Sequence, residues 1–157
     1  VFTYHHNHLE AYYPVAVAIL DCGLVCTASL PCPAEMEASI HISGTGSSIV
    51  DTIFVCRSAG SALDQPFPIS ADDVRNAVAT DVELLRKARL KPTAGDIRCI
   101  AFGHFVRSWV SVLRDSWSSR DTTARKLGVL EQLGNAVGGA GGIEALVAPI
   151  VRGETGM

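Results

Sequence analysis

Residues 1–33 read VFTYHHNHLEAYYPVAVAILDCGLVCTASLPCP, and the fold class follows from this stretch more than from any other. Residues 1–4 begin apolar and are rich in β-branched and aromatic side chains, a composition that favours a short strand. The pattern then changes, because Asn7 is a good N-cap and Glu10 stands three residues later, as in a capping box. We therefore expect an amphipathic helix that begins at Asn7 and runs through Cys22.

The predicted helix contains one residue that disturbs it and is followed by one that ends it. Pro14 lies in the second predicted turn, so it would either remove a hydrogen bond or move the helix start nearer Ala11. Gly23 is a typical residue just past a helix end. The helix is therefore expected to be short and to lead directly into the next element.

Two strands are predicted after the helix. Residues 24–30 form the first, which we expect Pro31 and Pro33 to end. Residues 48–57 form the second, and their near-continuous apolar character is typical of a strand buried on both faces. The order strand, helix, strand, strand indicates an α/β fold in which a parallel crossover unit is followed by an antiparallel hairpin.

The second half of the chain predicts helices. Ser70 is an N-cap, and apolar residues recur at helical spacing after it until Lys91-Pro92 ends the helix; these residues are Val74, Val78, Val82 and Leu85. A second helix is expected over residues 96–117, with Arg107 and Arg114 on its exposed edge. A third is expected over residues 121–134, and the glycine-rich residues 135–142 should break it before a last helix over residues 143–151.

Composition limits the class of protein. The 157 residues carry a formal net charge of −3 and are 48% apolar and 18% charged, which indicates a folded domain rather than a disordered chain. The longest apolar run, residues 14–20, is far shorter than the roughly 20 residues that cross a membrane. No basic segment precedes it as in a signal peptide, so we expect a cytoplasmic protein. Because the first residue is Val1 rather than Met, we also expect the tail of a longer protein.

The charges are unevenly distributed. Residues 1–74 contain a single Lys or Arg, Arg57, and eight Asp or Glu, whereas residues 75–126 contain eleven Lys or Arg and five Asp or Glu. Such a basic helical block, which also contains Trp109 and Trp117, could contact the phosphates of a nucleic acid. A solvated helical surface explains the same pattern, and both interpretations stay open.

Three groups of residues could carry chemistry. The turn Thr3-Tyr4-His5-His6-Asn7 follows a strand, and polar residues at the carboxyl ends of parallel strands are well placed to contact ligands. The same segment reads His6-x-His8-x-Glu10, a spacing that could present ligands to a transition metal, as in a metal-dependent hydrolase. The alternative to ligand contact is that His5 and His6 only cap or hydrogen-bond the turn.

The loop over residues 35–48 is glycine-rich and contains Glu35, Glu37 and His41. It lacks the Lys of a P-loop and precedes a strand rather than a helix, so it is no dinucleotide fingerprint. The five cysteines form no C-x-x-C pair, and their odd number and apolar surroundings indicate free thiols rather than disulfides or zinc.

Several strings in the first third of the chain resemble one family. They are VFTYHH (1–6), ILDCGLV (19–25), TASLP (27–31) and VDTIFVCR (50–57), with a weaker continuation in GDIRCIAFGH (95–104). Their order and spacing resemble the carboxyl-terminal part of bacterial adenine-specific DNA methylases, most closely the large members with an extra amino-terminal domain of unknown function. The resemblance implies that residues 1–58 are the end of a Rossmann-like catalytic domain, residues 59–69 a linker, and residues 70–157 a helical carboxyl-terminal region.

The resemblance also implies a reaction and its partners. Such enzymes bind S-adenosylmethionine at a glycine-rich turn and hold an adenine, rotated out of the DNA duplex, in an Asp-Pro-Pro-Tyr type motif. Neither motif occurs in this chain, so no catalytic or cofactor-binding residue is carried over. We expect the chain alone to be inactive and to require the preceding part of the same protein.

Position alone implies the remaining site residues. Thr3, Tyr4, His5, His6 and Asn7 would lie at the rim of the target-base pocket. Residues expected to contact DNA come from the loop and the basic block, namely Ser43, Thr45, Ser47, Arg86, Arg89, Arg107 and Arg114. The alternative function is a non-catalytic DNA-binding or assembly module that uses the basic block, residues 75–126.

Overall fold

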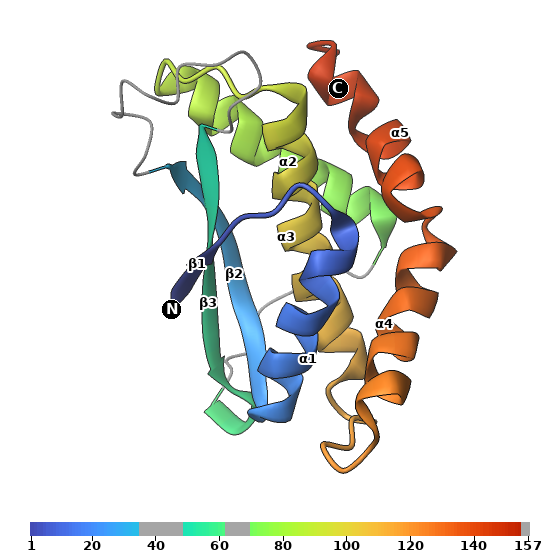
Figure 1. Ribbon diagram of the computed structural model, residues 1–157. Coiled ribbons are helices and arrows are strands. Elements are labelled where there is room, and N and C mark those ends of the chain that lie inside the picture. The colour runs from blue at the N-terminus through green and yellow to red at the C-terminus, as the bar shows by residue number, and fades with distance from the viewer. Residues whose placement is uncertain (35–48, 62–69, 155–157) are drawn as a thin grey trace, which may run out of the picture.

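The computed structural model describes residues 1–34, 49–61 and 70–154, and there it forms a three-stranded antiparallel sheet with α-helices packed on one face (Figure 1). The strands are β1 (Phe2–Tyr4), β2 (Leu24–Pro33) and β3 (Val50–Ser58). The α-helices are α1 (Tyr13–Asp21), α2 (Ala71–Lys87), α3 (Ala94–Leu113), α4 (Thr123–Ala136) and α5 (Gly139–Val151), and short 3-10 turns occupy Leu9–Tyr12 and Ala59–Ser61. The expected mixed α/β class is confirmed, while the Rossmann-like identity of the sheet stays a prediction.

The central strand of the sheet is β3, which runs antiparallel to both of its neighbours. The outer strands β1 and β2 are therefore parallel to each other, and α1 connects them. This is the expected crossover followed by a hairpin. The strands β1 and β2 are not adjacent, because β3 lies between them. In that position both edges of β3 find hydrogen-bonding partners, at least over the residues that β1 reaches.

The hairpin strands differ from expectation in two ways. The prediction that Pro31 and Pro33 end β2 is wrong, since they pair with Thr52 and Val50 of β3. They are tolerated because β2 is an edge strand, where a missing N–H need not break the ladder. The prediction that β3 is buried on both faces is also wrong: alternate residues are buried and half-buried, because the helices of the described residues cover one face only.

The start of α1 also corrects the sequence prediction. Asn7 forms no capping box; His8 precedes the 3-10 turn without a side-chain cap, and α1 begins at Tyr13. Pro14 explains the shift, because in the first turn of a helix its missing N–H has no intrahelical partner to lose. At the other end the helix stops at Asp21, one residue earlier than predicted, and Gly23, with φ of 71°, follows the helix end as predicted.

The helices of the second half begin at polar caps. Ser70 and Asp73 form a capping box on α2, as expected of Ser70. For α3 the cap is Thr93, with Asp96 completing a capping box, so the helix starts earlier than predicted and ends earlier, at Leu113. The break expected over residues 135–142 shrinks to residues 137–138, and the glycines that follow join α5.

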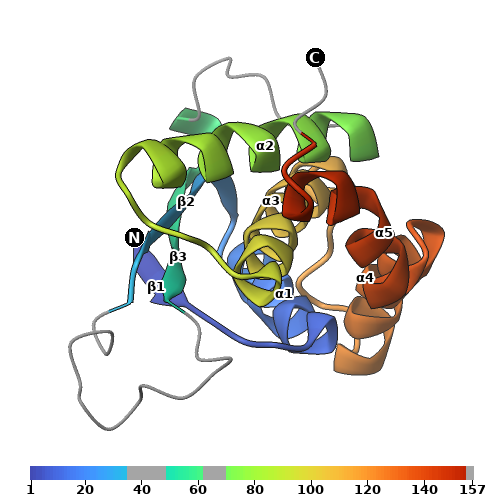
Figure 2. The same cartoon turned by 90° about the horizontal axis from the view of Figure 1, so that it is seen from above.

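The helices form two layers beside the sheet. Figure 2 shows α1 and α3 next to the strands, α4 and α5 beyond them, and α2 across one end. The helix α3 lies close against the hairpin at Gly103, where a Cβ atom would collide with Ser29 Oγ and press on Thr52. One buried apolar cluster extends from the turn after β1 to α5, so sheet and helices share a core.

No single helix in the described parts of the chain is both long and apolar enough to cross a membrane. Taken together, α4 and α5 satisfy the criteria of length and composition, although they meet at an angle of 42°.

Candidate functional site

Side-chain hydrogen bonds hold the turn that follows β1. The Tyr12 hydroxyl accepts a hydrogen bond from His6 N and donates one to His6 O, both at 3.2 Å. The Cys99 thiol of α3 donates to the same carbonyl at 3.3 Å, and the Tyr4 hydroxyl donates to Ala11 O at 3.0 Å. Burial raises the pKa of Tyr12, so its hydroxyl stays protonated and can keep both bonds.

The side chains of this turn divide into two sets. Tyr4 and His5 are half-buried, whereas Thr3, His6 and Asn7 are exposed. His8 N donates to His6 Nδ1 at 3.0 Å, so a neutral His6 ring carries its proton on Nε2 and presents an N–H donor to solvent. The five predicted rim residues therefore form a braced polar turn, with three of them available to a ligand.

His5 adds an unusual feature to the turn. Its Nδ1 atom is buried and has no hydrogen-bond partner among the described residues. A buried polar atom without a partner is costly and uncommon in folded proteins. Metal binding gains no support here: among residues 1–34, 49–61 and 70–154 no group of three or more His, Cys, Asp or Glu side chains could hold an ion.

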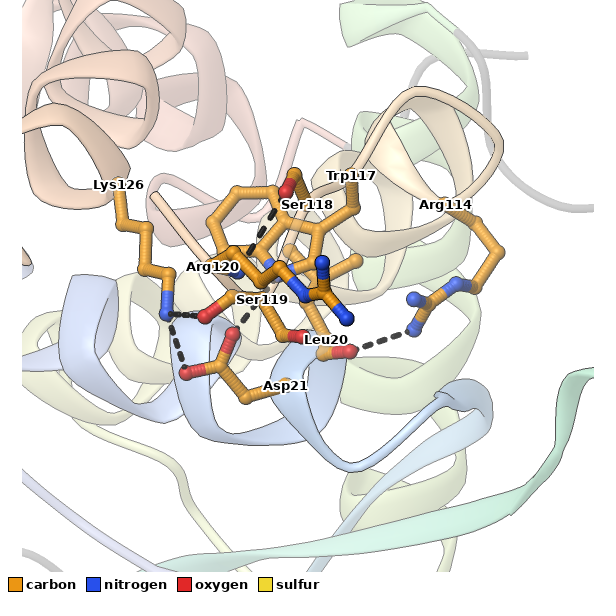
Figure 3. A network of polar contacts seen from close by, with 8 residues as sticks. All are labelled: Leu20, Asp21, Arg114, Trp117, Ser118, Ser119, Arg120 and Lys126. Carbon is orange, nitrogen blue, oxygen red and sulfur yellow. Dashed lines mark hydrogen bonds and ion pairs between the residues drawn. The ribbon is translucent and has the colours of Figure 1, made fainter. Parts of the chain in front are cut away.

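The predicted arginines separate into a structural pair and an exposed pair. Arg114 donates to Leu20 O at 2.8 Å (Figure 3). It also donates to Leu24 O at 3.0 Å, so it ties the end of α3 to the end of α1 and the start of β2. Arg107 is half-buried with its Nε atom enclosed. The prediction that these two arginines lie on an exposed edge of α3 is wrong, because that part of α3 packs against α1 and the sheet.

Arg86 and Arg89 lie together at a hollow of about 450 Å³, which they line with Leu90 and Lys91. Arg86 donates to Ile150 O at 3.2 Å, which holds this surface against the end of α5. Arg89 is the one non-glycine residue with positive φ, 63°, in the described parts of the chain. We call Arg86, Arg89 and Lys91 the cationic hollow; none of the residues lining it is acidic.

A second cavity, of about 400 Å³, lies between the first turns of α3 and the last turns of α5. Its lining is mostly apolar, and its Arg98 side chain is bound to Glu144 at 2.8 Å. The charges of that pair offset each other, so this cavity is less suited to an anion than the cationic hollow.

Sequence reasoning missed several residues of these regions. Lys91 belongs to the same basic run as Arg89 and could have been included on that ground. Tyr12 and Cys99 brace the turn after β1, but no sequence pattern links them to it. Tyr12 is 6 residues from His6 and Cys99 is 93 residues away. Ser43, Thr45 and Ser47 lie outside the described residues.

Comparison with known protein families, curated proteins and solved structures finds no match for this chain.

Proposed function

We propose that this chain is the carboxyl-terminal part of an S-adenosylmethionine-dependent DNA adenine methyltransferase. The observation that carries the proposal is the strand order: a strand, a helix and an antiparallel hairpin, with the two outer strands parallel. This is the arrangement that the resemblance of residues 1–57 implies for the end of the catalytic sheet. None of the five cysteines forms a disulfide, which suits a cytoplasmic enzyme.

One face of the sheet is left uncovered by the helices of the described residues, and this face supports the same proposal. The register places Leu30 opposite Ile53 and Ala28 opposite Val55 on the face away from the helices, and Leu30 is 47% exposed. Sheets of α/β enzymes are covered by helices on both faces. In the proposed enzyme the preceding part of the same protein covers this face.

The residues present do not fit S-adenosylmethionine. The connection from β1 to α1 contains no glycine, and no Asp-Pro-Pro motif occurs anywhere in the sequence. We therefore assign no step of methyl transfer to this chain. Its contribution in the proposed enzyme is positional: the braced turn holds the exposed His6 and Asn7 side chains where a base rotated out of the duplex would pass.

Methyl transfer tests this proposal. The longer protein that it requires is incubated with labelled S-adenosylmethionine and adenine-containing duplex DNA, and the nucleosides are analysed by mass spectrometry. We expect N6-methyladenine from the longer protein and none from residues 1–157 alone. Asn7→Ala should lower the rate, whereas Asn76→Ala, on the exposed side of α2, should not. Absence of methyladenine from the longer protein would refute the proposal.

The cationic hollow favours a second function, a DNA-binding module without chemistry. Arg86 is held in place by the end of α5, Arg89 and Lys91 are exposed, and phosphate is the DNA group that such a surface contacts. Both functions predict DNA binding, and methyl transfer separates them.

Salt dependence of DNA binding tests the hollow directly. Each phosphate contact contributes about 0.9 to the slope of log affinity against log salt. We expect the double variant Arg89→Gln with Lys91→Gln to lower the magnitude of that slope by nearly the contribution of two phosphate contacts. Lys87→Gln is the matched control, because Lys87 is paired with Glu83 at 2.9 Å on the same helix. A decrease of the slope by Lys87→Gln that is half as large as the decrease by the double variant would show that only total charge matters.

A further inference from the structure

Two cysteines face each other across the hairpin. The register pairs Cys26 of β2 directly with Cys56 of β3, beside the irregularity at Thr27. Directly opposed residues of antiparallel strands have Cα atoms about 4.5–5.5 Å apart. Disulfides span Cα separations of about 4.4–6.8 Å, so this pair lies within range without movement of the strands.

The two thiols are chemically unequal. A side-chain hydrogen bond with Cys26 lowers the pKa of the Cys56 thiol. The same bond, together with burial, raises the pKa of Cys26. Because the thiolate is the nucleophile in disulfide exchange, Cys56 is the thiol that reacts first.

The Cys56 sulfur is also more accessible to solvent than the Cys26 sulfur. Cys26 is fully buried and Cys56 is half-buried. Pairing of β1 with β3 stops at Phe54, so in the described chain β3 has a neighbour on one edge only where Cys56 lies. A small reagent can therefore approach Cys56, whereas the only sulfur placed to react with buried Cys26 in the strand register is that of Cys56.

The other cysteines lack such an arrangement. Cys32 is opposite Asp51 in the register, and Cys22 lies after the end of α1. Cys99 is buried against His6 O, and burial raises its pKa to about 11. None of these three is paired with another cysteine in the strand register.

We propose that Cys26 and Cys56 form a redox modification site, which closes to a disulfide by exchange with a low-molecular-weight disulfide such as glutathione disulfide. The Cys56 thiolate attacks one sulfur of the reagent, forms a mixed disulfide and releases one small thiolate, which takes up the proton that Cys56 lost. The Cys26 sulfur, as it gives up its proton, then attacks the Cys56 sulfur, and the second small thiol leaves. Two protein thiols are oxidised and one small disulfide is reduced to two thiols.

The consequence of closure is a cross-link at the open end of the hairpin. The ring spans residues 26–56 and includes the whole connection between β2 and β3. Closing a loop of that length restricts the unfolded chain, so the oxidised protein should melt at a higher temperature than the reduced protein. The site does not depend on methyltransferase activity.

Peptide mapping of the native protein tests the proposal. Trypsin is unsuitable, because Arg57 is the first Lys or Arg and four cysteines precede it in one peptide. Cleavage before Asp21, Asp51 and Asp64 separates Cys56 from the other three. The protein is incubated with glutathione disulfide, and its free thiols are alkylated. The digest is then sequenced by tandem mass spectrometry without reduction, so that a link through Cys26 is distinguished from one through Cys22 or Cys32.

We expect residues 21–50 and 51–63 to be linked through Cys26 and Cys56, with a loss of about 2 Da as two hydrogens leave. Reduced glutathione should reverse the link. Cys32→Ala should retain it and Cys56→Ala should abolish it; if Cys56→Ala does not fold, the map of the unsubstituted protein decides alone. A link through Cys22 or Cys32, a lasting glutathione adduct on Cys56, or no oxidation would each overturn the proposal.

Discussion

Lys126 joins three parts of the helical layer, and its removal should destabilise the protein measurably. Its Nζ atom donates to Asp21 Oδ2 at 2.9 Å and to Ser119 O at 2.7 Å (Figure 3). Trp117 Nε1 donates to the other oxygen of the same carboxylate at 2.9 Å. The Lys126 side chain is 10% exposed and that of Asp21 is 33% exposed, so the ammonium is the more deeply enclosed partner.

The expected loss for Lys126→Met is about 2 kcal/mol. Methionine keeps most of the aliphatic volume, so the packing cost is small. A hydrogen bond to a charged group contributes roughly 1.5–3 kcal/mol, and two are lost. The net loss is smaller than the contribution of these two hydrogen bonds added together. The reason is that the Asp21 carboxylate is partly exposed, can be rehydrated and keeps its bond from Trp117.

Urea unfolding, followed by circular dichroism, measures this loss. A double-mutant cycle with Asp21→Asn isolates the interaction, because asparagine can still accept from Trp117 through its amide oxygen. We expect a coupling free energy of about 1 kcal/mol. Lys87→Met is the control, since its pair with Glu83 is exposed and should contribute less than about 0.5 kcal/mol. Additive effects in the cycle would refute the reasoning.

Three further predictions concern stability. Gly103→Ala should lower the free energy of unfolding by about 1–3 kcal/mol because its Cβ meets Ser29, whereas Gly128→Ala, which meets nothing, should raise it by about 0.5–1 kcal/mol; equal urea midpoints would contradict this. Hydrogen bonds from Trp117 and Lys126 lower the pKa of Asp21, so its contribution is present above the unfolded pKa of about 4 and is lost as the pH falls through the lower folded value. Below pH 4 the unsubstituted protein should therefore lose more stability than Asp21→Asn, and parallel curves would exclude this origin. Asp81→Asn should weaken the contact of Asp81 with buried His104 at 2.6 Å and cost about 1–3 kcal/mol, which faster amide exchange in α2 would report.

Local signals in the sequence predicted much of the fold. Gly23 ends α1 and Ser70 begins α2 as expected, because a glycine past a helix end and a serine cap act on residues within one turn. Errors arose where several local signals compete. Asn7 is a good cap in isolation, but Pro14 fits best in a first turn, and the helix begins at Tyr13 instead.

The candidate site was predictable only in part. The sequence singled out the polar turn after β1, and the structure shows that some of its side chains are exposed. It also singled out Arg86 and Arg89, and the structure shows that they line a hollow. Arg114 shows why charge alone misleads, because its guanidinium is used by backbone carbonyls of α1 and β2. A basic residue in a helix carries no local mark that distinguishes these roles.

The sequence by itself determined the types and order of the elements, since caps, glycines and apolar spacing act over a few residues. Only the tertiary structure decided that β3 lies between β1 and β2, that helices cover one face of the sheet, and that Cys26 stands opposite Cys56. Each of these depends on residues far apart in the chain, whose meeting is set by the burial of a shared core and by strand register rather than by any local pattern.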